Sequence, residues 1–229
     1  MRKTALMLMA VLIGVVMTGC MGTPHWVKEG SGVHKAKGIP GIYGVGEGLA
    51  EVEEKTQTDL ASMQARTAAH KAEKNYVAAL LKDFVEAHPK WFKLDQIKQM
   101  DFYEKAAAAV AEKAGMTTQK VDEWLDSKGA KGEAGTLYVL RRIALDKQFF
   151  ADVEDTLKSV IEQNKDKILR VEIDEVLDGL KKEIGARVKD PLGAAMAKME
   201  QKKMEKGAAA AEKKGEMEEK AEQMEKEKK

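Results

Sequence analysis

The chain is poor in several residues that constrain a fold. Its 229 residues include one cysteine, four prolines and 5% aromatic residues, and the formal net charge at pH 7 is +1. One cysteine excludes an intramolecular disulfide. The near-zero charge excludes a strongly basic nucleic-acid binder, so we expect no nucleic-acid partner. Charged residues make up 34% of the chain, which favours charged, alanine-rich helices around a modest core over a large all-β architecture.

The N-terminus has the three parts of a secretory signal. The basic start Met1-Arg2-Lys3 precedes an apolar run over 4–17, and Thr18-Gly19-Cys20 follows. The uncharged stretch from Thr4 to Gly19 has 16 residues, fewer than the roughly 20 that a helix needs to span a bilayer. A cleaved signal peptide over 1–19 is therefore favoured over a transmembrane anchor.

Residues 17–20, Met-Thr-Gly-Cys, resemble the bacterial lipobox, with Met17 in place of the usual leucine. The resemblance implies that Cys20 becomes the first residue of the mature chain and carries acyl groups, which anchor it firmly in a membrane. Met21, which is not an aspartate, implies the outer membrane, with the protein facing the periplasm. The alternative is an ordinary secretory signal with a chance cysteine.

The glycine-rich polar segment over 20–40 shows neither the periodicity of a helix nor the alternation of a strand, so we interpret it as a tether. A domain over 41–165 follows. It begins with a strand over 41–46, where β-forming residues alternate with glycine, and a helix from about Thr58 or Asp59 to Ala87 comes next. Small residues in the first half of that helix indicate close packing on a sheet.

The rest of this domain is predicted to be a helix–hairpin–helix arrangement. A helical insertion covers about 89–118, with its main helix over 101–115, and strands over 120–125 and 136–145 form an antiparallel hairpin. Asp146 can cap the next helix. The fold class is therefore α+β, with a small antiparallel sheet of about three strands packed by helices.

The C-terminal part adds a helix over 166–190 and then a tail over 191–229. The tail from 198 onward consists of Lys, Glu, Ala, Met, Gln and Gly, with only Met and Ala as apolar residues. Such a segment buries too little surface to fold alone. Glu and Lys at helical spacing nevertheless favour helix, so a frayed solvated helix and a disordered tail both stay open.

No catalytic, cofactor or metal site is apparent in the sequence. The glycines over 44–48 lack the spacing of a dinucleotide fingerprint, and the predicted helix begins about ten residues too late to point its amides at a phosphate. We expect these glycines to permit a bend or a close strand contact. The histidines are isolated in sequence, and no serine lies in a nucleophile elbow; the four histidines are His25, His34, His70 and His88. We therefore expect no enzyme.

Three stretches together resemble the bacterial LPP-twenty lipoproteins, the family of FlgP-like flagellar and outer-membrane lipoproteins. They are Ile42-Tyr43-Gly44-Val45-Gly46-Glu47 with the alanine-striped helix after it, Val121-Asp122-Glu123-Trp124-Leu125, and Gly135-Thr136-Leu137-Tyr138-Val139-Leu140. The resemblance covers about 20–165. It implies a structural role in outer-membrane-associated rings or disks. The insertion over 89–118 and the last sixty or so residues depart from the family pattern.

Three functions stay open at this point. The first is a lipid-anchored envelope lipoprotein with a structural or assembly role that acts through protein partners or as a homo-oligomer, with flagellar or motility structures as one setting. The second is an envelope lipoprotein that binds a small ligand or peptide in a cleft over the sheet, for which a pocket at Trp124 or Tyr138 would count. The third is a peptidoglycan contact through the charged tail, which ends in Lys228-Lys229.

Overall fold

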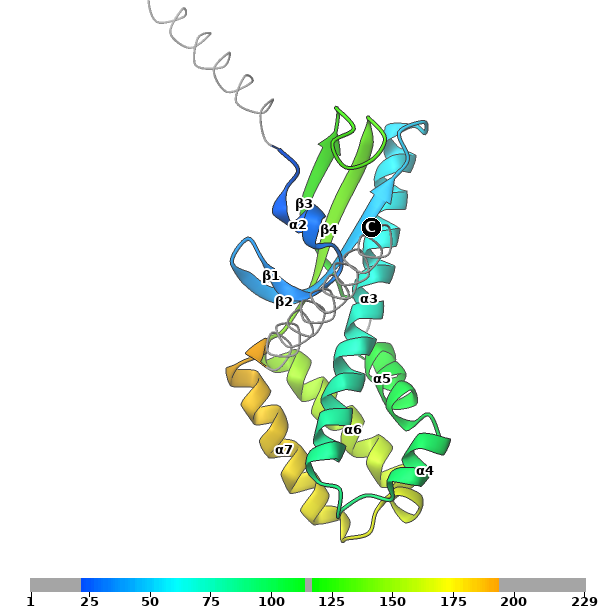
Figure 1. The fold of residues 1–229 in the computed structure, drawn as a ribbon, viewed down its shortest axis with the longest axis vertical. Helices are drawn as coiled ribbons and strands as arrows, with labels where there is room; N and C mark the ends of the chain where they lie inside the picture. The colour runs from blue at the N-terminus through cyan, green and yellow to red at the C-terminus, as the bar shows by residue number, and fades with distance from the viewer. Residues whose placement is uncertain (1–21, 114–116, 194–229) are drawn as a thin grey trace, which may run out of the picture.

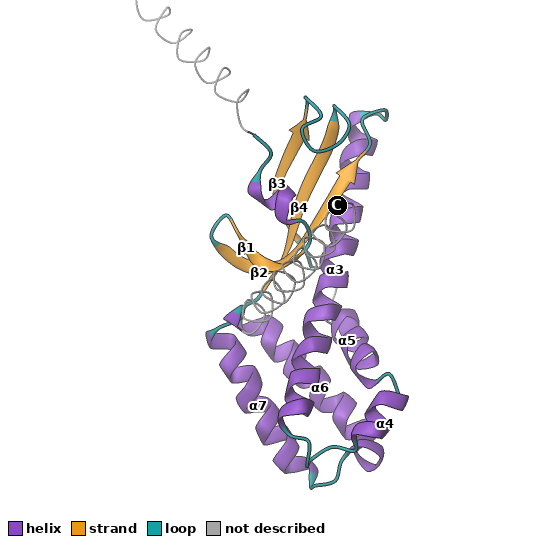
Figure 2. Ribbon diagram, in the orientation of Figure 1, coloured by secondary structure: helices purple, strands orange, loops and turns teal. Residues whose placement is uncertain are grey.

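A computed structural model describes residues 22–113 and 117–193 of the chain. Over these ranges the α+β class is confirmed, with six helices and a four-stranded antiparallel sheet (Figure 2). The elements in chain order are α2 (His25–Glu29), β1 (Gly32–Ala36), β2 (Ile39–Gly48), α3 (Glu54–Ala87), α4 (Leu94–Gln99), α5 (Phe102–Lys113), β3 (Gln119–Asp126), β4 (Thr136–Ala144), α6 (Lys147–Ile168) and α7 (Ile173–Lys189).

The sheet has the strand order β1-β2-β4-β3, with every neighbouring pair antiparallel. The predicted hairpin is present as β3 and β4, and Trp124 lies opposite Tyr138 in its register. The strand predicted at 41–46 is the middle of β2 and pairs with β4. The fourth strand, β1, was not predicted.

The long helix α3 joins the two halves of the molecule (Figure 1). Its first half crosses one face of the sheet, where Ala61 and Ala65 are fully buried against Leu137 and Val139 of β4. Its second half continues into a helical region formed with α4, α5, α6 and α7. The helix begins at Glu54, four to five residues before the predicted start, and ends at the predicted Ala87.

The interpretation of residues 20–40 as a tether is wrong for the part that the structure describes. From His25 onward this segment forms α2, β1 and the start of β2. A two-residue loop joins β1 to β2, and both of its residues have positive φ, 52° at Lys37 and 79° at Gly38. This is the left-handed geometry that matches the twist of a hairpin, and Gly38 adopts it without strain.

The helical half has one continuous core, to which the predicted insertion and the C-terminal helix both contribute. Phe92, Phe102 and Val110 lie in this core together with Leu180 and other residues of α3, α6 and α7. The boundary placed between residues 165 and 166 is wrong, because it falls inside α6. Asp146 caps α6 as expected, and its Oδ1 accepts a hydrogen bond of 2.9 Å from the Phe149 N–H.

The first residues of the predicted tail, from 191 onward, are packed on the domain. Leu192 is buried, and the Tyr76 hydroxyl donates a hydrogen bond of 3.1 Å to the Pro191 carbonyl oxygen. The start of the tail at 191 is therefore too early. The charged residues from 194 onward, the signal peptide and Cys20 lie outside the described residues.

Candidate functional site

The folded part of the chain begins close to the predicted lipidation site. The described residues start at Gly22, two residues after Cys20, and Trp26 is already buried, with 4% of its surface exposed. Six residues of extended chain span at most about 20 Å. A lipid on Cys20 would therefore hold this side of the domain near the bilayer surface.

Helix α2 packs on the sheet face opposite α3. Trp26 and Val27 are buried there in a cluster with Tyr43, Tyr138 and Leu140. The Trp26 indole Nε1–H donates to a carboxylate oxygen of Asp122 at 3.0 Å, and the Lys37 ammonium lies 2.8 Å from the same oxygen. The rings of Trp124 and Tyr138, with centroids 5.5 Å apart, belong to this cluster. These aromatic residues therefore serve packing.

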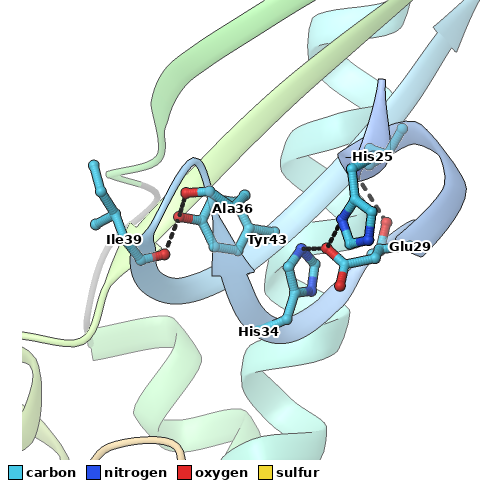
Figure 3. Close-up of polar contacts among 8 residues, drawn as sticks. His25, Glu29, His34, Ala36, Ile39 and Tyr43 are labelled. Atoms are coloured by element: carbon cyan, nitrogen blue, oxygen red, sulfur yellow. Dashed lines mark hydrogen bonds and ion pairs between the residues drawn. The ribbon is translucent and has the colours of Figure 1, made fainter. Parts of the chain in front are cut away.

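Two histidines share one carboxylate beside α2 (Figure 3). The Glu29 Oε2 atom lies 3.3 Å from Nδ1 of His25 and 3.6 Å from Nε2 of His34. His34 also stacks on the Tyr43 ring, with a centroid distance of 4.8 Å. Burial lowers the pKa of His34 below its ordinary value of 6.5, although Glu29 acts in the opposite direction. The burial of His34 therefore favours its neutral form.

The glycine-rich end of β2 is a packing surface for α3. A Cβ atom on Gly44 would overlap the Ala65 carbonyl oxygen, and one on Gly46 would overlap the Ala61 carbonyl oxygen. The Cα surface of this strand is thus covered by the backbone of α3. The expectation that these glycines permit a close contact is confirmed.

Serine hydroxyls of the described residues take part in structural hydrogen bonds. Ser31 Oγ accepts from the Val45 N–H at 2.9 Å, and Ser62 Oγ accepts from Arg141 at 2.8 Å. The same Arg141 guanidinium donates to both the hydroxyl and the carbonyl oxygen of Thr118, each at 2.7 Å, which fixes the start of β3. None of these hydrogen bonds involves a histidine, so none of them pairs a serine nucleophile with a histidine general base.

The carboxylate of Asp126 organises the loop between β3 and β4. It accepts hydrogen bonds from the N–H groups of Ala130 at 2.8 Å, Lys131 at 2.7 Å and Gly132 at 3.4 Å. Burial raises the pKa of Asp126, but these backbone donors lower it more, so the net pKa lies below the ordinary value. The carboxylate acts as an internal anion that the loop wraps around.

A buried pair of ionisable residues on α3 was not predicted. His70 and Glu73 are one helical turn apart, and Nδ1 of His70 lies 3.0 Å from Oε2 of Glu73. The Glu73 side chain is 1% exposed and that of His70 is 13% exposed. Within the described part of the chain, Glu73 Oε1 and His70 Nε2 are buried without a hydrogen-bond partner. Their spacing in the sequence places both residues on one face of a helix but does not show that this face is buried.

A cavity of about 170 Å³ lies beside this pair, where the sheet meets the helical half. Its walls include the buried residues Glu73, Ile143 and Phe149 and the exposed rim residues Asp146 and Gln148. The remaining lining residues are His70, Thr117, Gln119, Ala144 and Asp152. An N–H at Nδ1 of His70 can donate to Oε2 of Glu73 at this distance. The other carboxylate oxygen, Oε1, has no hydrogen-bond donor among the described residues.

Metal-ligand clusters and membrane-spanning helices are both absent from the described residues. Over 22–113 and 117–193, no group of three or more histidine, cysteine, aspartate or glutamate side chains is arranged to hold a metal ion. In the same ranges, no helix is both long and apolar enough to cross a bilayer.

Comparison of the chain with models of known protein families, with curated proteins and with solved structures gives no match.

Proposed function

We propose that this chain is a lipid-anchored lipoprotein of the bacterial cell envelope, with a structural or assembly role. The observation that carries the proposal is the apolar run ending in Thr18-Gly19-Cys20, followed within six residues by the folded domain. On this proposal the mature chain starts at Cys20, faces the periplasm at the outer membrane and catalyses no reaction. The LPP-twenty resemblance supports an assembly role, including one in motility.

The position of α2 supports an arrangement in which the domain acts next to the membrane. The Trp26 indole ties α2 to β3 through Asp122, so the lipid end of the chain is fixed to the sheet without a long spacer. Without a spacer, partners must come to the membrane surface to meet this domain.

Two exposed leucines support docking of protein partners or self-association. Leu49 is 60% exposed and Leu125 is 52% exposed. They lie at the same end of the sheet, because Gly48 and Leu125 both lie opposite Leu137 in the strand register. Leu49 and Leu125 are therefore the residues at this end of the domain through which we propose that a partner or a second copy makes contact.

The experiment is metabolic labelling with radioactive palmitate, followed by membrane fractionation. The native chain should incorporate label and sediment with outer membranes. Cys20→Ser should lose both properties, whereas Thr23→Ser, a matched change three residues later, should keep them. Label on the Cys20→Ser chain, or an unlabelled native chain in the soluble fraction, would refute the proposal.

The second candidate function is ligand binding. The cavity beside His70 and Glu73, with its unpartnered buried polar atoms, is a better candidate for the ligand site than the packed aromatic cluster at Trp124 and Tyr138. A peptidoglycan contact through the tail is a further alternative for residues outside the described ranges. Cross-linking of the chain to purified cell wall, with and without residues 198–229, would test it.

A further inference from the structure

We propose that the cavity between α3, the end of β4 and the start of α6 binds a primary ammonium group, with Glu73 Oε1 as its principal acceptor. This inference is independent of the lipid anchor and concerns a different part of the fold. It rests on four properties of the cavity: an unpartnered carboxylate oxygen, an excess of acidic groups, its size and its apolar walls.

Of these four properties, the unpartnered carboxylate oxygen gives the strongest support to the proposal. A buried carboxylate is unfavourable unless hydrogen bonds or an opposite charge compensate it. His70 satisfies Oε2 of Glu73, at 3.0 Å, but Oε1 is buried without a partner among the described residues. A ligand that donates hydrogen bonds and carries positive charge would compensate Oε1.

The charges around the cavity favour a cation. Glu73, Asp146 and Asp152 line it, and its lining includes no lysine or arginine. Asp146 already accepts from the Phe149 N–H, and Asp152 accepts from the Gln148 side chain at 3.0 Å. These two aspartates therefore contribute negative charge at the rim, while Glu73 keeps an oxygen available in the floor. An anionic ligand would meet three carboxylates.

Size and wall chemistry select an amine over a metal ion. A volume of 170 Å³ corresponds to about six water molecules, since one water occupies about 30 Å³ of liquid. An ammonium group on a four-carbon chain fits this volume, and the side chains of Ile143 and Phe149 can pack on its methylene groups. Histidine and carboxylate side chains line the cavity, but no three of them among the described residues are arranged to hold a metal ion.

The ammonium group could come from a free small amine or from a lysine side chain of another protein. Two probes distinguish these sources: n-butylammonium, and a short peptide with blocked termini that contains one lysine. Binding of n-butylammonium alone would indicate a free amine. Binding of the peptide as well would indicate that a lysine of a partner enters the cavity.

The test is isothermal titration calorimetry of the full chain in detergent at pH 7.5 with n-butylammonium chloride. Binding is expected at millimolar concentration, and Glu73→Gln should weaken it at least tenfold. Asp152→Asn, a rim change that leaves the buried pair intact, should weaken it about threefold. The matched control is Glu86→Gln, on the same helix but exposed and outside the cavity lining, which should leave affinity unchanged.

The thermal midpoint of each variant, followed by circular dichroism, shows whether it folds, and Asp152→Asn keeps the test valid if Glu73→Gln does not. Four results would overturn the proposal. They are equal binding of n-butanol, preferential binding of butyrate, the absence of measurable heat at 10 mM n-butylammonium, and unchanged affinity in both cavity variants.

Discussion

Replacement of Gly46 by alanine tests the contact that joins α3 to the sheet. Gly46 has no positive φ, so the substitution adds no backbone strain of its own. A new Cβ would instead overlap the Ala61 carbonyl oxygen and the Ala65 nitrogen, which are backbone atoms of α3. Because these atoms cannot rotate away as a side-chain end can, α3 would have to move from β2.

The expected cost follows from the packing. Overfilling a well-packed core costs about 1–3 kcal/mol, and a clash with backbone places Gly46→Ala near 3 kcal/mol. For a domain of this size, 1 kcal/mol shifts the midpoint by about 2–4 °C, so the midpoint should fall by about 6–12 °C.

The matched control is Gly185→Ala in α7. A Cβ at Gly185 meets no atom within 4 Å, and the residue is exposed inside a helix. Alanine is favoured over glycine there by about 0.5–1 kcal/mol, so this variant should melt about 1–4 °C higher. Thermal unfolding followed by circular dichroism measures both. If Gly46→Ala melts at as high a temperature as Gly185→Ala, β2 and α3 do not pack as closely as described.

Three further changes have defined outcomes. Trp26→Ala should cost about 3–5 kcal/mol in the free energy of unfolding, measured in urea, because it empties the buried site under α2; a cost below 1 kcal/mol would contradict that packing. The lowered pKa of His34 means that its contribution to stability is intact above about pH 6.5 and declines as the pH falls toward its folded-state pKa. The loss in urea midpoint between pH 7.5 and 5.5 should therefore shrink in His34→Gln, and an unchanged loss would exclude His34 as its source. Burial raises the pKa of Tyr76 to about 12, so absorbance at alkaline pH should show one tyrosine fewer ionising near pH 12 in Tyr76→Phe, and an unaltered titration there would contradict its burial.

The helices and the central hairpin could be predicted because their signals are local. Alternation over 120–125 and 136–145 predicted β3 and β4, and the alanines of α3 predicted a close contact with a sheet. Asp146 was correctly predicted to cap α6, because the cap depends on a hydrogen bond only three residues away. Each of these features is encoded within a few residues of where it occurs.

The segment over 22–40 could not be predicted because its structure depends on distant residues. Helix α2 has five residues, too few to be stable alone, and is fixed by Trp26 packing on the sheet and bonding to Asp122, 96 positions away. The turn at Lys37-Gly38 lacks the Asn-Gly or Asp-Gly pair that marks such hairpins in a sequence, and the strand before it is short and carries charge.

The cavity beside His70 and Glu73 was equally out of reach of the sequence. The two residues look like members of a solvated helical face, because charged residues surround them in the chain. Their burial arises where the ends of β4 and the start of α6 meet the middle of α3. Only the tertiary fold shows that a carboxylate oxygen is left there without a partner.

Mass spectrometry of the N-terminal peptide from the membrane-purified native chain tests the central proposal most directly. The account predicts a peptide that begins at Cys20 and carries a diacylglyceryl thioether together with an N-acyl chain. A peptide that begins at Met1, one that begins at Cys20 with an unmodified thiol, or one that begins after Cys20 would contradict it.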